Sequence, residues 1–206
     1  VKHVEAEGDA VNYTSMEDMP SGSLFHYQVT AASGSYVGGI IGITKTAVSD
    51  LSIKGAYVKG SSYTGGIAGQ IAPAVVTENI TVGESGYPVY ISGSGTTAGV
   101  GSHSSSGSTE TGYLKNAKVR YTYISGGSNT SGVIMGGWYY QVQKALVDHC
   151  YIKGTGGETH GTTGSGTGVQ QSLVVDSKIE GTSNVSGIGK GQSSSLCHVT
   201  VKNTVI

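Results

Sequence analysis

Two carboxylates in the second half of the chain have the residue types and spacing that acid–base chemistry on sugars requires. Asp148 and Asp176 occupy matching places in two adjacent repeats of the sequence. If adjacent repeats stack as parallel strands, residues at matching places lie about 5 Å apart on one face. A retaining glycosidase needs a similar separation between its two carboxyl groups. The pair is therefore a candidate for catalysis on polysaccharides.

The other repeats favour a structural interpretation of the same position. In the other repeats the same position is occupied by Asp50, Asn79 and Asn116. A catalytic pair of carboxylates gives no reason for asparagine at the equivalent positions. Asp and Asn turn the backbone through hydrogen bonds from their side chains. We therefore predict a ladder of turn residues and no catalytic residue, with the two aspartates as the alternative.

Three consecutive aromatic residues, Trp138, Tyr139 and Tyr140, form the strongest candidate for ligand binding. Successive side chains of a strand point to opposite faces, so at least one of the three must face outward. An exposed aromatic face can stack on a sugar ring or anchor a protein partner. Tyr36 and Tyr63 precede shared glycines by three residues and are predicted to stack and extend this surface. The opposing interpretation places Trp138 inside the molecule and Tyr140 over its end.

Metal, cofactor and nucleophile motifs are not found in the sequence. The six histidines form neither an HExxH motif nor a clustered spacing, so no metal is predicted. His149 beside Asp148 is interpreted as a surface histidine. Glycine-rich runs without a following helix are turns rather than phosphate cradles, and no cofactor is expected. Cys150 and Cys197 fall in repeats two apart, beyond disulfide reach, and are predicted to be free thiols that pack in the interior.

Composition narrows the class of partner. Charged residues are 12% of the chain and the net charge is −1, so the basic surface typical of nucleic-acid binding is missing. The sequence contains no run of about 18 apolar residues, so membrane insertion is not predicted. Thirteen tyrosines against one Trp and one Phe suit half-exposed strand faces. A glycan or a host-cell protein is the expected partner.

An internal repeat supplies the elements that must position these residues. Each copy has a short apolar strand, a turn of small residues and a glycine flanked by branched apolar residues. The copies are Val29–Ile43, Val58–Ile71, Tyr90–Ser102, Tyr123–Trp138, Tyr151–Thr167 and Lys178–Gln192. Their shared glycines are Gly39, Gly66, Gly99, Gly132, Gly161 and Gly187, separated by 26 to 33 residues.

Such a unit cannot bury its apolar face alone, but stacked units form a continuous core. The sequence therefore predicts an all-β fold, a right-handed parallel β-helix of about six glycine-rich coils. Residues 1–28 carry no repeat and are expected to form an N-terminal cap or lead-in, with residues 29–206 as the solenoid of one domain. An antiparallel sandwich and a barrel are the rival architectures. We expect the repeated glycines to supply positive φ at corners and close approach between coils.

Segments Gly38–Ile43 and Gly65–Gln70, with Asp148–Thr155, resemble the bacterial GLUG repeat, a Gly-Gly-apolar-x-Gly turn followed by a strand. The resemblance covers residues 29 to about 201. It implies a β-solenoid in a secreted or cell-surface bacterial protein, including adhesins. We therefore expect a non-catalytic, adhesin-like binding module. The alternatives are a polysaccharide lyase or hydrolase, for which Lys153 and Lys178 are candidate cations, and a structural stalk or phage-type receptor-binding tip.

Overall fold

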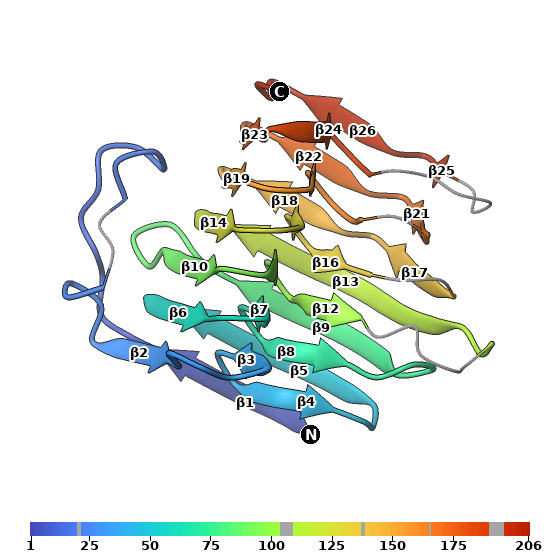
Figure 1. Cartoon of the computed structure of the whole chain (residues 1–206), viewed down its shortest axis with the longest axis horizontal. Helices are drawn as coiled ribbons and strands as arrows, with labels where there is room; N and C mark the ends of the chain where they lie inside the picture. The colour runs from blue at the N-terminus through green and yellow to red at the C-terminus, as the bar shows by residue number, and fades with distance from the viewer. Residues whose placement is uncertain (20–21, 104–108, 137–138, 165, 190–195) are drawn as a thin grey trace.

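The chain folds as a β-solenoid of about six turns, which confirms the predicted fold class (Figure 1). The computed structural model describes residues 1–19, 22–103, 109–136, 139–164, 166–189 and 196–206. Every regular element in these ranges is a strand, so none of them contains a helix that could span a membrane. All pairs between named strands are parallel. The first four coils run through four stacked sheets, here called A to D, before they return to sheet A, and in the described residues of the later coils no strand of sheet D is found.

Sheets A and B form two walls of the solenoid. Sheet A contains β1 (Lys2–Glu7), β5 (Val48–Lys54), β9 (Val76–Val82), β13 (Gly112–Arg120), β17 (Tyr140–Gln143), β18 (Leu146–Asp148), β21 (Thr167–Gln170), β22 (Leu173–Val175), β25 (Leu196–Cys197) and β26 (Thr200–Lys202). Sheet B contains β2 (Tyr27–Thr30), β6 (Ala56–Gly60), β10 (Val89–Gly93), β14 (Thr122–Gly126), β19 (Tyr151–Gly154) and β23 (Lys178–Glu180).

Sheets C and D complete the coil with shorter strands. Sheet C contains β3 (Tyr36–Gly38), β7 (Tyr63–Gly65), β11 (Thr96–Ala98), β15 (Thr130–Ser131), β20 (Glu158–His160) and β24 (Ser183–Ser186). Sheet D contains β4 (Ile41–Thr44), β8 (Ala68–Ile71), β12 (Gly101–His103) and β16 (Ile134–Met135).

The core is a set of branched apolar rungs that run along the solenoid. In sheet B, Val58, Ile91, Ile124, Ile152 and Ile179 pair in sequence from coil to coil. Each of them is at most 1% exposed. Since β-branched side chains pack well on a pleated surface, identical rungs give the coils a fixed register.

The shared glycines are required by close stacking rather than by positive φ. A Cβ built on Gly99 would lie 2.0 Å from the carbonyl oxygen of Gly132, and one on Gly132 would lie 2.0 Å from that of Gly161. Any side chain there would push the coils apart. None of these glycines is among the residues with positive φ, so that part of the expectation is wrong.

Residues other than glycine make most of the left-handed turns in the described ranges, and all of them except Ala74, Tyr139 and Asn184 belong to two ladders. The bend ladder lies within sheet A, where it interrupts the strands. Strand register aligns its members, which are His3, Asp50, Asn79, Asn116, Lys144, Gln171 and His198, with φ between 51° and 58°. The corner ladder lies where sheet A passes to sheet B. Its members are Tyr121, His149, Asp176 and Asn203, with φ between 45° and 52°.

The register corrects the predicted alignment of the two aspartates. Asp148 ends β18 and pairs with Val175, so Asp176 is level with His149 instead. Neither aspartate belongs to the bend ladder. In the later coils the bend-ladder position is occupied by Lys144 and Gln171. Because lysine and glutamine rarely adopt positive φ, the sequence pattern concealed them there.

The expected N-terminal segment, residues 1–28, contains both a strand of sheet A and a segment outside the coils. Strand β1 pairs with β5 and therefore belongs to sheet A, whereas residues 9–19 and 22–26, here called the strap, run along the outside of the coils. In Figure 1 the strap is the blue loop that rises beside the strand ends from β2. Its apolar residues Val11, Met19 and Phe25 pack with Tyr57 of sheet B, beside the half-buried Tyr90 and Tyr123.

Candidate functional site

A groove lies between the strap and the corner ladder. Its volume is about 560 Å³, within the range of small-molecule sites in proteins. The residues that define it are Tyr13 and Glu17 of the strap, Tyr121, His149 and Asp176 of the corner ladder, and Tyr151 and Lys178 of sheet B. The groove therefore combines aromatic faces with groups that donate and accept hydrogen bonds.

The aromatic side of the groove is built on two coils. The ring of Tyr121 stacks on the imidazole of His149 with centroids 4.9 Å apart, and the Arg120 guanidinium lies 5.5 Å from the centroid of the same tyrosine. Tyr13 approaches from the strap. Its partial burial raises the pKa of the phenol, and the nearby Tyr121 adds to the effect. Both tyrosines are half-buried, so each keeps part of its ring accessible.

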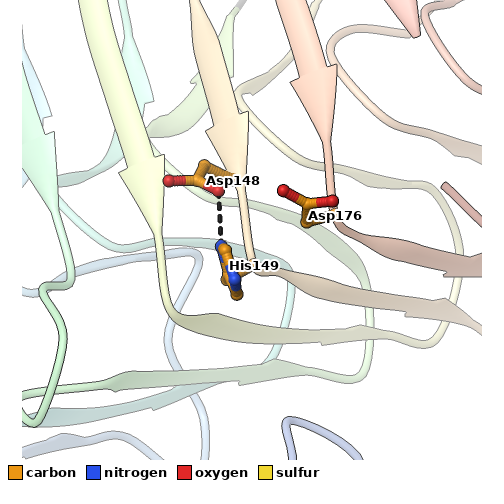
Figure 2. A group of neighbouring side chains, drawn as sticks. All are labelled: Asp148, His149 and Asp176. Atoms are coloured by element: carbon orange, nitrogen blue, oxygen red, sulfur yellow. Dashed lines mark hydrogen bonds and ion pairs between the residues drawn. The ribbon is translucent and has the colours of Figure 1, made fainter. Parts of the chain in front are cut away.

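The polar side is a short network around Asp148. Arg120 donates from Nε to Asp148 Oδ2 at 2.9 Å, and His149 Nδ1 is 2.5 Å from Asp148 Oδ1. The Asp148 side chain is 12% exposed and that of His149 48% exposed. Asp176 comes from the next coil, and donor atoms of Asp148, His149 and Asp176 all lie within 4.8 Å of one another. Figure 2 shows the three side chains gathered at the ends of neighbouring strands.

The far end of the groove is closed by charge pairs. Lys178 donates from Nζ to Glu17 Oε2 at 2.9 Å, which links the strap to sheet B, and this hydrogen bond raises the pKa of the lysine. The same ammonium lies 5.0 Å from the ring centroid of Tyr151. The Tyr151 hydroxyl donates to Glu180 at 2.6 Å, and that bond lowers the pKa of the glutamate.

Cys150 lines the groove but is not equipped as a nucleophile. The residue is buried and its thiol donates to the carbonyl of Val119 at 3.3 Å. Burial raises the pKa of the thiol to about 12, so the reactive thiolate is scarce at neutral pH. Cys150 and Cys197 are both free, as predicted. The expected burial of Cys197 is wrong, because it is exposed.

The predicted aromatic site separates into several places. Tyr36 and Tyr63 stack as expected, with ring centroids 5.3 Å apart on the outside of sheet C. Tyr139 is 50% exposed. Tyr140 is 1% exposed, packs on His103 and donates its hydroxyl to the carbonyl of Tyr113. It is therefore core and offers no stacking face. Trp138 lies outside the described residues.

The groove contains residues that sequence reasoning passed over. His149 is exposed, as expected of a surface histidine, yet it is bonded to Asp148 and stacked on Tyr121. Tyr121, His149 and Asp176 each directly follow a strand of sheet A. That shared place after an apolar strand is the signal that would have grouped them.

Comparison of the chain with protein-family models, with curated proteins and with solved structures found no match.

Proposed function

We propose that this chain is a non-catalytic binding module of a secreted or cell-surface protein, and that it binds a glycan in the groove beneath the strap. The observation that carries the proposal is the groove itself, in which tyrosine faces and hydrogen-bonding side chains line one cavity of about 560 Å³. Sugars present apolar C–H faces and a rim of hydroxyls. Aromatic rings complement the faces, and carboxylate, imidazole and ammonium groups complement the hydroxyls.

The low net charge of −1 favours a neutral ligand over a polyanion. Near the groove the cations Arg120 and Lys178 are already paired with Asp148 and Glu17. A ligand that relied on its own charge would have to displace those pairs. A ligand that bonds through hydroxyls would leave them in place.

A glycan array tests the proposal directly. The wild-type chain is expected to bind a defined set of glycans. Tyr121→Ala is expected to weaken binding at least tenfold, because stacking on an aromatic ring contributes about 1 to 3 kcal/mol to the binding free energy. Tyr113→Ala is the matched control, since this half-buried tyrosine lies on the outer side of sheet A away from the groove.

The pair Tyr36→Ala and Tyr63→Ala tests the second aromatic surface in the same assay. Loss of binding in this pair with none in Tyr121→Ala would move the site from the groove to sheet C. If no glycan on the array is bound and the chain captures a purified host protein instead, the ligand is a protein and not a glycan.

A polysaccharide hydrolase or lyase is the second candidate, favoured by the closeness of Asp148 and Asp176. Its weakness is that Asp148 is buried and held by Arg120 and His149, which restrains it from exchanging protons with a ligand. Release of soluble fragments from a bound polysaccharide, abolished by Asp176→Asn, would establish the enzyme and overturn the binding module.

A further inference from the structure

We propose that Asp148, His149 and Asp176 form a binding site for a divalent transition-metal ion, of the Zn(II) type, at the floor of the groove. The three residues supply two carboxylates and one imidazole from two adjacent coils (Figure 2). This inference goes beyond glycan binding and does not depend on it, because the ion needs only these three side chains and water.

Donor type selects the class of ion. Oxygen ligands alone suit Ca²⁺ and Mg²⁺, whereas a set of imidazole nitrogen and carboxylate oxygen suits Zn(II) and its neighbours in the first transition row. The donor atoms of the three residues lie within 4.8 Å of one another. Ligands on one tetrahedral zinc ion are about 3.4 Å apart, given bonds of about 2.1 Å. Rotation of the exposed side chains of His149 and Asp176 covers that difference.

The local electrostatics leave a place for a cation. Asp148 and Asp176 bring two negative charges to one spot, and the Arg120 guanidinium engages only Oδ2 of Asp148. Oδ1 lies 2.5 Å from His149 Nδ1. Within the described part of the chain, the exposed Asp176 carboxylate has no hydrogen bond or ion pair. A divalent ion would sit between Asp148 Oδ1 and His149 Nδ1 and also engage Asp176.

The surroundings hold the donors in position. Arg120 fixes the Asp148 carboxylate from the side away from the site, as an outer hydrogen bond does for a metal ligand. The ring of Tyr121 stacks on one face of the His149 imidazole, with centroids 4.9 Å apart. His149 and Asp176 are also set by left-handed backbone of adjacent coils, whose hydrogen bonds fix their spacing. His149 and Asp176 also line the groove, from which water would reach a bound ion.

The bend ladder contains a natural control in His3 and Asp50. These two residues also come from adjacent coils at positive φ, with His3 Nδ1 4.0 Å from Asp50 Oδ2. This pair contains one carboxylate, and that carboxylate accepts a hydrogen bond from the Asn79 amide at 2.9 Å. His3 and Asp50 therefore have the residue types of the proposed site but lack the second carboxylate of that site, so this pair is not expected to bind the ion.

Titration of the metal alone tests the inference. The chain carrying Cys197→Ser, which removes the exposed thiol beside His198, is stripped with a chelator and titrated with ZnCl₂ by calorimetry. We expect one ion per chain with micromolar affinity, a rise in Tm on binding, and weaker binding of Ca²⁺. Cobalt(II) should give the visible absorption of a four- or five-coordinate ion.

Variants then locate the ion. Asp176→Asn and His149→Ala should each weaken Zn(II) binding at least tenfold, whereas Asp50→Asn and His3→Ala should leave it unchanged. Asn is compatible with left-handed backbone, so Asp176→Asn is expected to fold, which circular dichroism verifies. The inference is overturned by the absence of saturable one-to-one binding, by binding that both groove variants retain, or by preference for Ca²⁺. Because no sugar is present, this result is separate from that of the glycan array.

Discussion

The bend ladder and the corner ladder share a backbone conformation and differ in what surrounds them. Both are columns of residues with φ near 50°, seven in the bend ladder and four in the corner ladder, which spans only the later coils. In the bend ladder, Asn79 donates to Asp50 and Asn116 donates to Asn79, at 2.9 and 3.1 Å, so neighbouring coils satisfy one another. In the corner ladder, Tyr121, His149 and Asp176 form no such amide chain and face a groove roofed by the strap.

This difference shows that repetition supplies positions and that local departures from the repeat supply a site. An amide ladder has its hydrogen bonds paired internally, which leaves few groups for a ligand. The corner ladder replaces the amides by Tyr121, His149 and Asp176, and the strap adds Tyr13 and Glu17 from outside the repeat. Variation at a structurally constant position is also how solenoids present binding surfaces.

The two cysteines should give the largest contrast, since each adjoins one of the ladders. Cys150 follows His149 of the corner ladder and is buried, whereas Cys197 precedes His198 of the bend ladder and is exposed. Because burial raises the pKa of Cys150 to about 12, its thiol stays protonated below that pH. In the folded protein at pH 8, Cys197 should react with iodoacetamide at least about 100-fold faster, because burial shields the sulfur of Cys150 and suppresses its thiolate.

Peptide mass spectrometry over time measures the two alkylation rates, with urea-unfolded protein as the control in which the rates should converge. Equal rates in the folded state would mean that the floor of the groove opens readily to solvent.

Truncating a core side chain between the two ladders should lower the stability of the coil that carries both of them. Val119 lies between Asn116 and Tyr121, and its side chain is fully buried. Val119→Ala removes two buried methyl groups and leaves a cavity, so we expect the free energy of unfolding to fall by about 2 kcal/mol. Urea unfolding measures the change. The outward-facing Val175→Ala should cost less than half as much, and equal losses would contradict the assigned facing.

A smaller gain in stability should follow from relief of left-handed strain in the bend ladder. Lys144 has φ of 58°, which costs a residue with a Cβ about 1 to 2 kcal/mol. Lys144→Gly removes that strain but adds chain entropy to the unfolded state, for a net gain of about 0.5 to 1 kcal/mol. Lys144→Ala keeps the strain and should give no gain. Thermal unfolding of the two variants decides whether the backbone at this position is left-handed.

The smallest effect is expected at the rim of the groove. Glu17→Gln removes the ion pair with Lys178 that ties the strap to sheet B. Because the pair is exposed, Tm should hardly change. Hydrogen exchange of residues 13–17 should become faster, and high salt should reproduce the effect in the wild type. Glu5→Gln, which disturbs another surface pair at Lys54, is the control and should leave the strap unaffected.

Several features of the molecule could be predicted from the sequence because they repeat. The apolar rungs and the column of shared glycines recur once per coil, which is enough to establish stacked parallel strands. Tyr36 and Tyr63 stack because they precede equivalent glycines. The free thiols of Cys150 and Cys197 followed from the same counting of coils.

Other features depended on contacts that no repeat announces. The sequence pattern aligns Asp148 with Asp50 because each lies two residues after an apolar residue, Leu146 or Val48, but hydrogen bonding between coils places Lys144 there instead. The exposure of Tyr140 also could not be read from its neighbours, because its burial depends on contacts with His103 and Tyr113 from other coils.

The sequence by itself determined the solenoid, because each coil must bury the same apolar face against the next, and that need leaves a period in the chain. Only the tertiary structure decided the site. Tyr13 and Glu17 reach the corner ladder from more than 100 residues away in sequence, and Asp176 meets His149 across a coil boundary. These contacts depend on strand register and on the path of the strap. Both are properties of the folded chain, and neither produces a repeating pattern in the sequence.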